Sequence, residues 1–383
     1  MTPAGEIHIE LMHRAGRVDS VTIASTRPEA ARVLVDKTPE QVLSMVPLLF
    51  SLCGNAQAYA ALLACRAALG LAAEPVADAA REGLVQLEAV REHAWRILLD
   101  WPALLGQPAD KAAMATLLKL DRQFKACLFV DGEAFSLDSR LLINVPGFNG
   151  LIAELTDLID RAIFGGGLGR FLAITDAAQL LDFVAGNTGL AAQLLNALYQ
   201  RDWLALGNSS VACLPELEYA ELHQQMHNAD LSAFCLAPQW QGRCYEATPL
   251  SRQQAQPLIA ELQSRYGRGL LVRFVAVLLE VTAIPKHVAP PTRATVGGAG
   301  GVGLAQVQAA RGLLIHRLAL RQGRVYDYRI VAPTEWNFHP DGVLAQGLKA
   351  LQATDADDLR RQAEWLIQAV DPCVAYRVTL HKQ

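Results

Sequence analysis

The sequence lacks any strong excess or clustering of charge. Its 34 lysines and arginines nearly balance 38 aspartates and glutamates, so the formal net charge is −4 at pH 7. The basic residues do not gather in any one segment. Proteins that bind nucleic acid or an anionic membrane surface through electrostatics carry basic patches. We therefore expect neither among the binding partners.

Regularly spaced cysteine pairs are also absent. The chain has seven cysteines, an odd number, at positions 53, 65, 127, 213, 235, 244 and 373, and none of them form a CxxC pair. Under the reducing conditions of the cytosol, such cysteines remain free thiols. We expect Cys65, Cys127, Cys213 and Cys235 to be ordinary core residues.

No targeting or membrane-spanning segment is recognisable. The start MTPAGEIHIE has no basic region followed by an apolar core, so we expect no signal peptide and a cytoplasmic protein. The stretch from Gln41 to Cys65 contains no charge, but Pro47 and several polar residues interrupt it. We expect a buried helix, a loop and a second helix there, with no membrane insertion.

A linker rich in proline, glycine or serine is missing too. With 383 residues and a hydrophobic content of 52%, the chain is long and apolar enough for a large core. No charge block divides it. We therefore expect one continuous domain over residues 1–383.

Hydrophobic periodicity predicts a mainly helical body with β-hairpins at both ends. Alternating apolar residues at 7, 9 and 11 and at 21 and 23 flank Ala15-Gly16, which indicates an N-terminal hairpin. Two further strand-like runs, 313–320 and 325–331, are joined at a turn that ends with Gly323, where glycine tolerates the positive φ of a tight hairpin. Stretches rich in alanine and leucine favour core-facing helices. They span residues 39–52, 56–71, 76–105, 111–124, 151–163, 177–184, 190–199 and 252–280. The fold class expected is α+β, mainly α.

Two motifs suggest functions that their context does not support. The glycine pattern GxGxxG at residues 298–303 fits a dinucleotide-binding turn, but the proline-rich segment before it cannot be the buried strand that such a turn needs. We interpret these glycines as a flexible approach to Arg311. His223 and His227 share one helical face but lack the adjacent glutamate of a zinc protease, so we expect a partly exposed polar face.

The C-terminal hairpin carries polar groups at both of its ends. Arg311 lies at its entry and Pro333-Thr334 at its exit, and antiparallel pairing brings these ends together. A guanidinium, a hydroxyl and the backbone after a proline then converge on one anionic ligand. No obvious reactive group accompanies them, so the hairpin predicts a binding site.

The same region resembles the large subunits of nickel-iron hydrogenases. The similarity to the C-terminal third of that family rests on ARGxLxH at residues 310–316, GxVxxY at 323–328, PTxWN at 333–337 and DPC at 371–373. At the other end, GEIHIE at residues 5–10 and LCG at 52–54 follow the order and spacing of the family's opening strand and first cysteine motif. Residues 60–290 show little similarity. The resemblance implies a hydrogenase large-subunit-like helical core with small N- and C-terminal β-hairpins.

In nickel-iron hydrogenases, each of two motifs supplies a cysteine that binds nickel terminally and one that bridges nickel to an iron carrying cyanide and carbon monoxide. The resemblance makes Cys53 and Cys373 the terminal ligands, but Ala56 and Tyr376 stand where the bridging thiolates belong. Because nickel in such a site needs a cage of soft thiolates, we expect no nickel. Iron that already carries strong-field diatomic ligands needs only a few further donors, which two thiolates supply.

The positions around the family's iron are nearly all retained. The resemblance implies that Arg311 hydrogen-bonds one cyanide, and that Thr334 with the backbone near Pro333 binds the other. Leu314 and the end of the second strand then give carbon monoxide an apolar wall. These residues would bind an Fe(CN)2CO unit.

Other hydrogenase features are missing. The family's N-terminal glutamate, a proton relay, falls at Ala4, and the histidine after the last cysteine falls at Thr379. The sequence also stops ten residues after Cys373, where the family has a cleavable tail. With these departures, the sequence resembles the HupK/HoxV group of hydrogenase expression/formation proteins. The resemblance implies a non-catalytic scaffold, or metallochaperone, that holds Fe(CN)2CO transiently. Its partners would be the hydrogenase large-subunit precursor, which receives the unit, and iron-carrying hydrogenase maturation chaperones.

Two other functional classes also fit the sequence. One is a residual oxidoreductase that uses Cys53 and Cys373 as a dithiol or as a mononuclear iron site, with Tyr376, His316 and Glu335 as candidate acid/base groups. The other is a purely structural hydrogenase-like paralogue, against which the retention of both cysteines stands.

Overall fold

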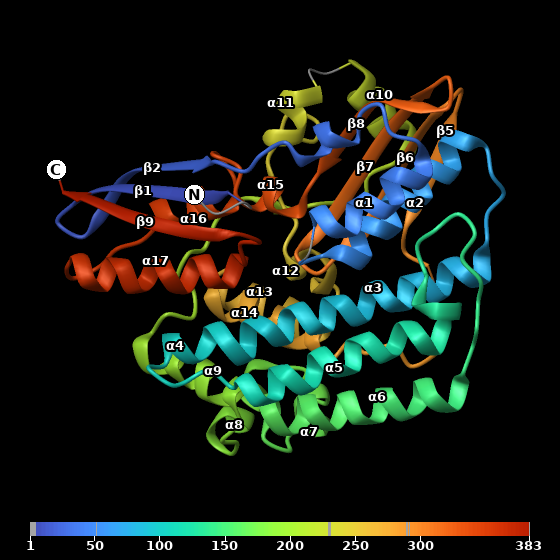
Figure 1. The fold of residues 1–383 in the computed structure, drawn as a ribbon. Coiled ribbons are helices and arrows are strands. Elements are labelled where there is room, and N and C mark those ends of the chain that lie inside the picture. The colour runs from blue at the N-terminus through green and yellow to red at the C-terminus, as the bar shows by residue number, and fades with distance from the viewer. Residues whose placement is uncertain (1–4, 51, 229–230, 289, 291, 383) are drawn as a thin grey trace.

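The structure is a computed structural model and describes residues 5–50, 52–228, 231–288, 290 and 292–382, so Ala4 lies outside the described residues. Helices form most of the body, and a small sheet lies near each end of the chain (Figure 1). The predicted fold class, α+β and mainly α, is confirmed.

The N-terminal sheet joins the two ends of the chain. Strands β1 (Glu6–Arg14) and β2 (Arg17–Ser25) form the predicted antiparallel hairpin, and Ala15 and Gly16 adopt positive φ in the turn. Strand β9 (Ala375–Lys382) then pairs parallel to β1, which the sequence did not predict. This pairing fixes the segment that holds Cys373 beside the N-terminal sheet.

The helices that make up the body begin and end as follows: α1 Pro39–Leu49, α2 Gly54–Leu69, α3 Pro75–Trp95, α4 Trp101–Leu104, α5 Lys111–Leu128, α6 Val145–Ile159, α7 Leu168–Leu172, α8 Ala177–Ala185, α9 Leu190–Arg201, α10 Tyr219–Asn228, α11 Leu231–Leu236, α12 Pro249–Gln253, α13 Pro257–Tyr266, α14 Leu270–Val281, α15 Pro333–Asn337, α16 Val343–Lys349 and α17 Ala356–Val370. Short 3-10 turns span Ala30–Leu34 and Val130–Gly132, and π-helical turns span Arg96–Asp100 and Asp160–Phe164.

Helix α14 lies at the centre of this body. Helices α3, α9, α12, α13 and α17 pack around it, and almost all of its side chains are buried. One of them, Arg273, is neutralised by Glu246 of the short strand β4 (Tyr245–Glu246), which pairs with β3 (Ala212–Cys213). Helices α3, α5 and α6 lie side by side as a layer below the centre in Figure 1.

The helical stretch predicted over residues 252–280 is interrupted. It contains the end of α12, all of α13 and most of α14, since Pro257 starts α13 and Gly267, at a φ of 68°, ends it. Proline is favoured in the first turn of a helix and disfavoured in its interior. The prediction of one continuous run was wrong because it gave apolar periodicity more weight than these two residues.

The C-terminal sheet has four antiparallel strands, of which the sequence predicted two. Its order is β5 (Thr295–Ala299), β6 (Val302–Ala309), β7 (Gly312–Arg321) and β8 (Arg324–Val331). The predicted hairpin is β7–β8, with Gln322 and Gly323 at positive φ in its turn. The unpredicted strands β5 and β6 join at Gly300 and Gly301.

The glycine pattern at residues 298–303 therefore forms a hairpin, and our interpretation of it as a flexible approach was wrong. The hairpin packs on α2. A Cβ at Gly303 would come within 1.9 Å of the Ala64 carbonyl oxygen. Gly303 thus allows strand β6 to contact the backbone of α2, since no larger residue permits this approach.

The uncharged stretch from Gln41 to Cys65 is a helix, a loop and a second helix, as predicted, formed by α1 and α2. Most side chains of α2 are buried against β6 and β7. Among the described residues, no helix is both long and apolar enough to cross a membrane.

Candidate functional site

Cys53 is the residue that immediately precedes α2. The first two backbone N–H groups after Gly54, those of Asn55 and Ala56, donate to the Glu88 carboxylate of α3 at 2.7 and 3.0 Å. Carboxylates stabilise the N-terminal end of a helix because the unpaired N–H groups and the helix dipole attract negative charge. Glu88 thus fixes the start of α2, and with it Cys53.

Cys373 lies in the short connection between α17 and β9. Asp371, at a φ of 61°, ends α17. Its carboxylate pairs with Arg96 Nε at 2.6 Å and with Arg311 Nε at 3.1 Å. Arg96 also hydrogen-bonds the carbonyl oxygen of Pro372. Two arginines therefore hold the backbone on the N-terminal side of Cys373.

The two cysteines, both half-buried, belong to one site. Burial, with the negative charges of Glu88 and Cys373, raises the pKa of Cys53 to about 12, although Arg311 and a hydrogen bond from Gln57 oppose this rise. Thr334 Oγ1 lies 3.4 Å from Cys373 Sγ. The structure thus brings Cys53, Cys373, Arg311 and Thr334 together, although they come from distant parts of the chain.

Arg311 is buried in the turn between β6 and β7 and is held by carboxylates. Its Nη1 lies 3.2 Å from Glu92 Oε2, and its Nε lies 3.1 Å from Asp371 Oδ1. Burial lowers the pKa of Arg311, but Asp371 and Glu92 outweigh that effect and raise it above the ordinary value. Asn337 donates to the Arg311 carbonyl oxygen at 3.0 Å. The remaining nitrogen, Nη2, hydrogen-bonds to no described residue and is the donor left for a ligand.

Arg27, which the sequence analysis missed, reaches the same site from the segment after β2. Its Nη1 donates to Thr334 Oγ1 and to Glu335 Oε1, each at 2.8 Å. Burial lowers the pKa of Arg27, but the charges of Cys373, Glu335 and Cys53 outweigh that effect and raise it. Arg27 is therefore a second, half-buried cation beside the thiols.

Gln57 contacts the Cys53 sulfur from one turn further along α2. Its Nε2 lies 3.7 Å from Cys53 Sγ, and its Oε1 lies 2.8 Å from His316 Nε2. His316 Nδ1 in turn lies 2.8 Å from the Tyr328 hydroxyl. The spacing of four residues between Cys53 and Gln57 on a helix was the signal that could have identified this contact.

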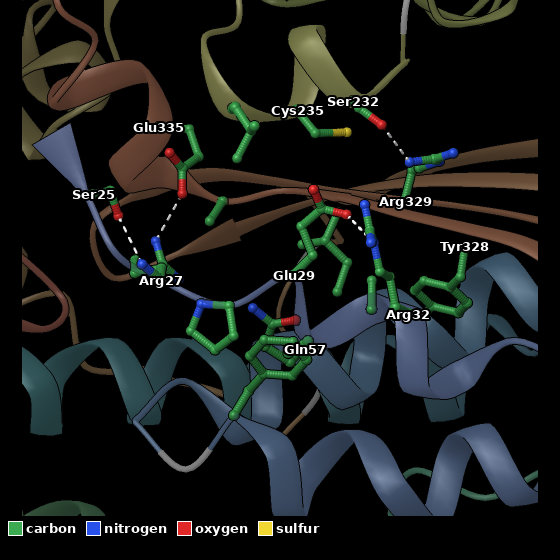
Figure 2. A pocket seen from close by; sticks show the side chains of 17 residues that line it. Ser25, Arg27, Glu29, Arg32, Gln57, Ser232, Cys235, Tyr328, Arg329 and Glu335 are labelled. Carbon is green, nitrogen blue, oxygen red and sulfur yellow. Dashed lines mark hydrogen bonds and ion pairs between the residues drawn. The ribbon is translucent and has the colours of Figure 1, made fainter. Parts of the chain in front are cut away.

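A cavity of about 120 Å³ adjoins the site (Figure 2). Arg27, Glu335, Gln57 and Tyr328 line it, together with the thiol of Cys235. Figure 2 shows the Arg27–Glu335 ion pair at one end of this cavity and Tyr328 at the other. Arg27 and Gln57 belong both to the lining of this cavity and to the surroundings of the two cysteines.

The chain is similar over nearly its full length to several known proteins. The hydrogenase expression/formation protein HupV of Azotobacter chroococcum mcd 1 is 30% identical over 381 residues, which cover 98% of this chain and 99% of the relative. The chain belongs to the family of hydrogenase expression/formation proteins. Another member, HoxV of Cupriavidus necator, is 30% identical over 407 residues, with coverage of 99% of this chain and 97% of the relative. The proposed resemblance to the HupK/HoxV group is confirmed.

The fold of this formation protein is that of hydrogenases. The family described as nickel-dependent hydrogenase matches residues 276–379. The Ni-Fe-Se hydrogenase from D. vulgaris Hildenborough in the as-isolated oxidized state has a TM-score of 0.66 at 13% identity, with 94% of each chain covered. That of Desulfomicrobium baculatum has a TM-score of 0.64. The hydrogenase large-subunit-like core is therefore confirmed, while the relatives named above are called hydrogenase expression/formation proteins.

Ala56 and Tyr376, the two residues that the family resemblance led us to expect in place of bridging cysteines, make ordinary structural contacts. Ala56 is buried in the packing of α2, where its N–H contacts Glu88. Tyr376 lies on β9, and its hydroxyl accepts a hydrogen bond from Gln368 at 3.2 Å. Among the described residues, no cluster of three or more His, Cys, Asp or Glu side chains is arranged to hold a metal.

Leu314 and Pro333 are buried near the site. Leu314 lies on the same face of β7 as His316 and packs in the cluster formed with α2, whereas Pro333 starts α15 one residue before Thr334. The predicted polar face of α10 agrees with the structure: His223 is half-buried and stacks on Tyr219, and His227 is exposed.

Proposed function

We propose that the chain acts in hydrogenase maturation as a non-catalytic holder of an Fe(CN)2CO unit. Cys53 and Cys373 bind the iron, and the unit then passes to the hydrogenase large-subunit precursor. The observation that carries the proposal is the convergence of these two thiols with Arg311 and Thr334 in one site. The names of the relatives, which are hydrogenase expression/formation proteins, support the role in maturation.

Charge favours this cargo. A ferrous ion with two cyanides and one carbon monoxide is neutral, so binding by two thiolates gives a dianionic assembly. A buried anion is stable only where cations and hydrogen-bond donors face it. Arg27 and Arg311 supply those cations, because the charges of both cysteines act on each of them. Nη2 of Arg311 donates to one cyanide, and Thr334 with the start of α15 at Pro333 binds the other. Leu314 contributes the apolar wall beside carbon monoxide.

The thiols also suit transient binding. Burial and the nearby negative charges of Glu88 and Cys373 raise the pKa of Cys53, which favours the protonated thiol until iron binds and displaces the proton. Reprotonation of the sulfur favours release. The site therefore holds the unit without the full set of soft ligands that would retain nickel.

The proposed partners follow from the proposed cargo. Iron-carrying maturation chaperones would deliver the unit, and the large-subunit precursor would accept it, both in the cytoplasm. Neither nucleic acid nor a membrane would take part. Nickel would not be a native component, since Ala56 and Tyr376 replace two of the thiolates that the hydrogenase centre uses.

Cysteine substitutions test this function in a host that makes hydrogenase. Cys53→Ser and Cys373→Ser should each abolish the cyanide and carbonyl infrared bands of the anaerobically purified protein and reduce the yield of active hydrogenase. Cys127→Ser is the matched control, because Cys127 is a half-buried free thiol on α5. Unchanged iron content and hydrogenase yield in both site variants would show that these thiols serve only packing.

A further inference from the structure

A chain of hydrogen bonds ends on the sulfur of Cys53. It runs from the Tyr328 hydroxyl to His316 Nδ1 at 2.8 Å and from His316 Nε2 to Gln57 Oε1 at 2.8 Å. It then continues from Gln57 Nε2 to Cys53 Sγ at 3.7 Å. His316, Gln57 and Tyr328 are all nearly or fully buried. Three polar side chains in an apolar cluster thus lead to one thiol.

Every donor in this chain points towards the sulfur. Burial lowers the pKa of His316 to about 3, so the imidazole is neutral and carries one proton. The carbonyl oxygen of Gln57 can only accept, so that proton is on Nε2. Nδ1 must then accept from the Tyr328 hydroxyl. The amide of Gln57 is left with its N–H facing Cys53.

The reverse orientation of the amide is disfavoured. With iron bound, the Cys53 sulfur is a thiolate and can only accept a hydrogen bond, so a carbonyl oxygen turned towards it would be repelled. The same flip would place the NH2 of Gln57 against the N–H of His316, unless the imidazole moved its proton to Nδ1. His316, with Tyr328 as the donor to Nδ1, therefore stabilises the orientation in which the N–H of Gln57 faces the sulfur.

We propose that Gln57, oriented by His316 and Tyr328, tunes how strongly the Cys53 thiolate donates electrons to bound iron and so how readily the cargo leaves. The proposal rests on the proposed function for the identity of the cargo. A hydrogen bond to a coordinating thiolate withdraws electron density from the sulfur and weakens its bond to the metal. His316 and Tyr328 are positioning residues in this scheme, since neither contacts the sulfur.

Two substitutions separate the contact from its positioning. Gln57→Leu keeps the size of the side chain and removes the donor. Tyr328→Phe keeps the ring and removes the hydrogen-bond partner of His316 Nδ1, which weakens the hold of His316 on the Gln57 amide. Tyr59→Phe is the matched control, because Tyr59 is a buried tyrosine of the same cluster, and its hydroxyl donates to the Asp78 carbonyl oxygen, away from this hydrogen-bond chain.

The first readout is the carbonyl infrared band of protein purified anaerobically with its cargo. Loss of the donor makes the thiolate a stronger ligand, so the band should move to lower wavenumber in Gln57→Leu. Tyr328→Phe should shift part of the population in the same direction. Transfer to the large-subunit precursor should slow by roughly two- to tenfold in Gln57→Leu, as expected for one hydrogen bond. Tyr59→Phe should keep the wild-type band.

The second readout uses cobalt(II) as a probe and does not depend on the cargo. The sulfur-to-cobalt charge-transfer band of the purified protein should move to longer wavelength in Gln57→Leu and, in part, in Tyr328→Phe. Suppose that the cobalt band shifts in the two variants while the wild-type protein shows no iron carbonyl bands. That result would support the role of the hydrogen-bond chain and overturn the proposed cargo. Wild-type bands in either Gln57→Leu or Tyr328→Phe would overturn the inference and leave the cargo standing. Absence of both iron and cobalt bands from the wild-type protein would overturn both.

Discussion

Replacing Arg311 with methionine should destabilise the protein by about 3 kcal/mol. The guanidinium lies between Glu92 and Asp371, whose side chains are only 4% exposed each. Removing one partner of a buried ion pair costs about 3–5 kcal/mol, because the remaining charge stays buried. Both carboxylates keep another arginine, since Arg91 pairs with Glu92 at 2.9 Å and Arg96 pairs with Asp371 at 2.6 Å. The loss should therefore fall at the lower end of that range.

Urea unfolding measures this loss directly. If the slope of the unfolding free energy is about 3 kcal/mol per molar urea, the midpoint should fall by about 1 M with the slope unchanged. Arg161→Met is the control, because Arg161 and its partner Asp157 are 66% and 64% exposed, and solvent screens such a surface pair so that its loss should leave the midpoint nearly unchanged. A loss below about 1 kcal/mol in Arg311→Met would refute the account of Arg311 as a cation fixed by two buried carboxylates.

Arg311→Lys separates charge from geometry at the same position. Lysine keeps the positive charge but lacks the planar fork that addresses two carboxylates and a ligand together. It should destabilise the protein less than methionine does and should retain part of the iron load, with the cyanide bands shifted. An iron load as low as in Cys53→Ser would mean that Arg311 acts on the thiols themselves and not on the ligands of iron.

Three further outcomes are expected. Gly303→Ala should cost several kcal/mol in urea unfolding, because its Cβ would lie 1.9 Å from a backbone oxygen of α2. Gly300→Ala is the control and should cost only about 1–2 kcal/mol, because this position has open space around it and a φ of +60°. Equal losses would contradict the close packing of β6 on α2. Burial raises the pKa of Glu88 from 4.5 to about 7, so the folded protein binds this proton more tightly than the unfolded one, and stability should fall as the pH rises from about 4.5 to about 7. Glu88→Gln should remove on the order of 1–3 kcal/mol of that pH dependence, and an unchanged profile would mean that Glu88 is solvated. Protein isolated from cells grown with nickel should contain far less than one nickel per chain by elemental analysis; stoichiometric nickel would contradict the assigned roles of Ala56 and Tyr376.

The parts of the fold that depend on local patterns could be predicted from the sequence. Alternation of apolar residues and positive-φ turn residues identified β1–β2 and β7–β8, and helical periodicity identified α1 and α2 on either side of the Cys53 loop. The strands β5 and β6 were missed because they contain several glycines, and glycine is a poor strand former. The close packing of these strands on α2 explains why glycine is needed at Gly303. The pairing of β9 with β1 joins the two ends of the chain, which no local pattern reveals.

The residues of the site also divide into those that a local motif reveals and those that depend on contacts between distant parts of the chain. Cys53, Cys373, Arg311 and Thr334 were selected from motifs that a family resemblance made recognisable. Arg27 was missed because its contacts with Thr334 and Glu335 span 307 and 308 residues. Buried carboxylates such as Glu88 and Glu92 appear in the sequence as ordinary charges of a long amphipathic helix. Their role depends on which groups α3 faces, and only the packed structure determines that.

The infrared spectrum of the wild-type protein, purified without oxygen from cells that are making hydrogenase, tests the central claim most directly. We expect two cyanide stretches and one carbonyl stretch. The iron content should be proportional to the intensity of these bands, and nickel should not be present in a stoichiometric amount. A spectrum without these bands, from protein that carries stoichiometric zinc or a flavin instead, would contradict the proposal that Cys53 and Cys373 hold an Fe(CN)2CO unit.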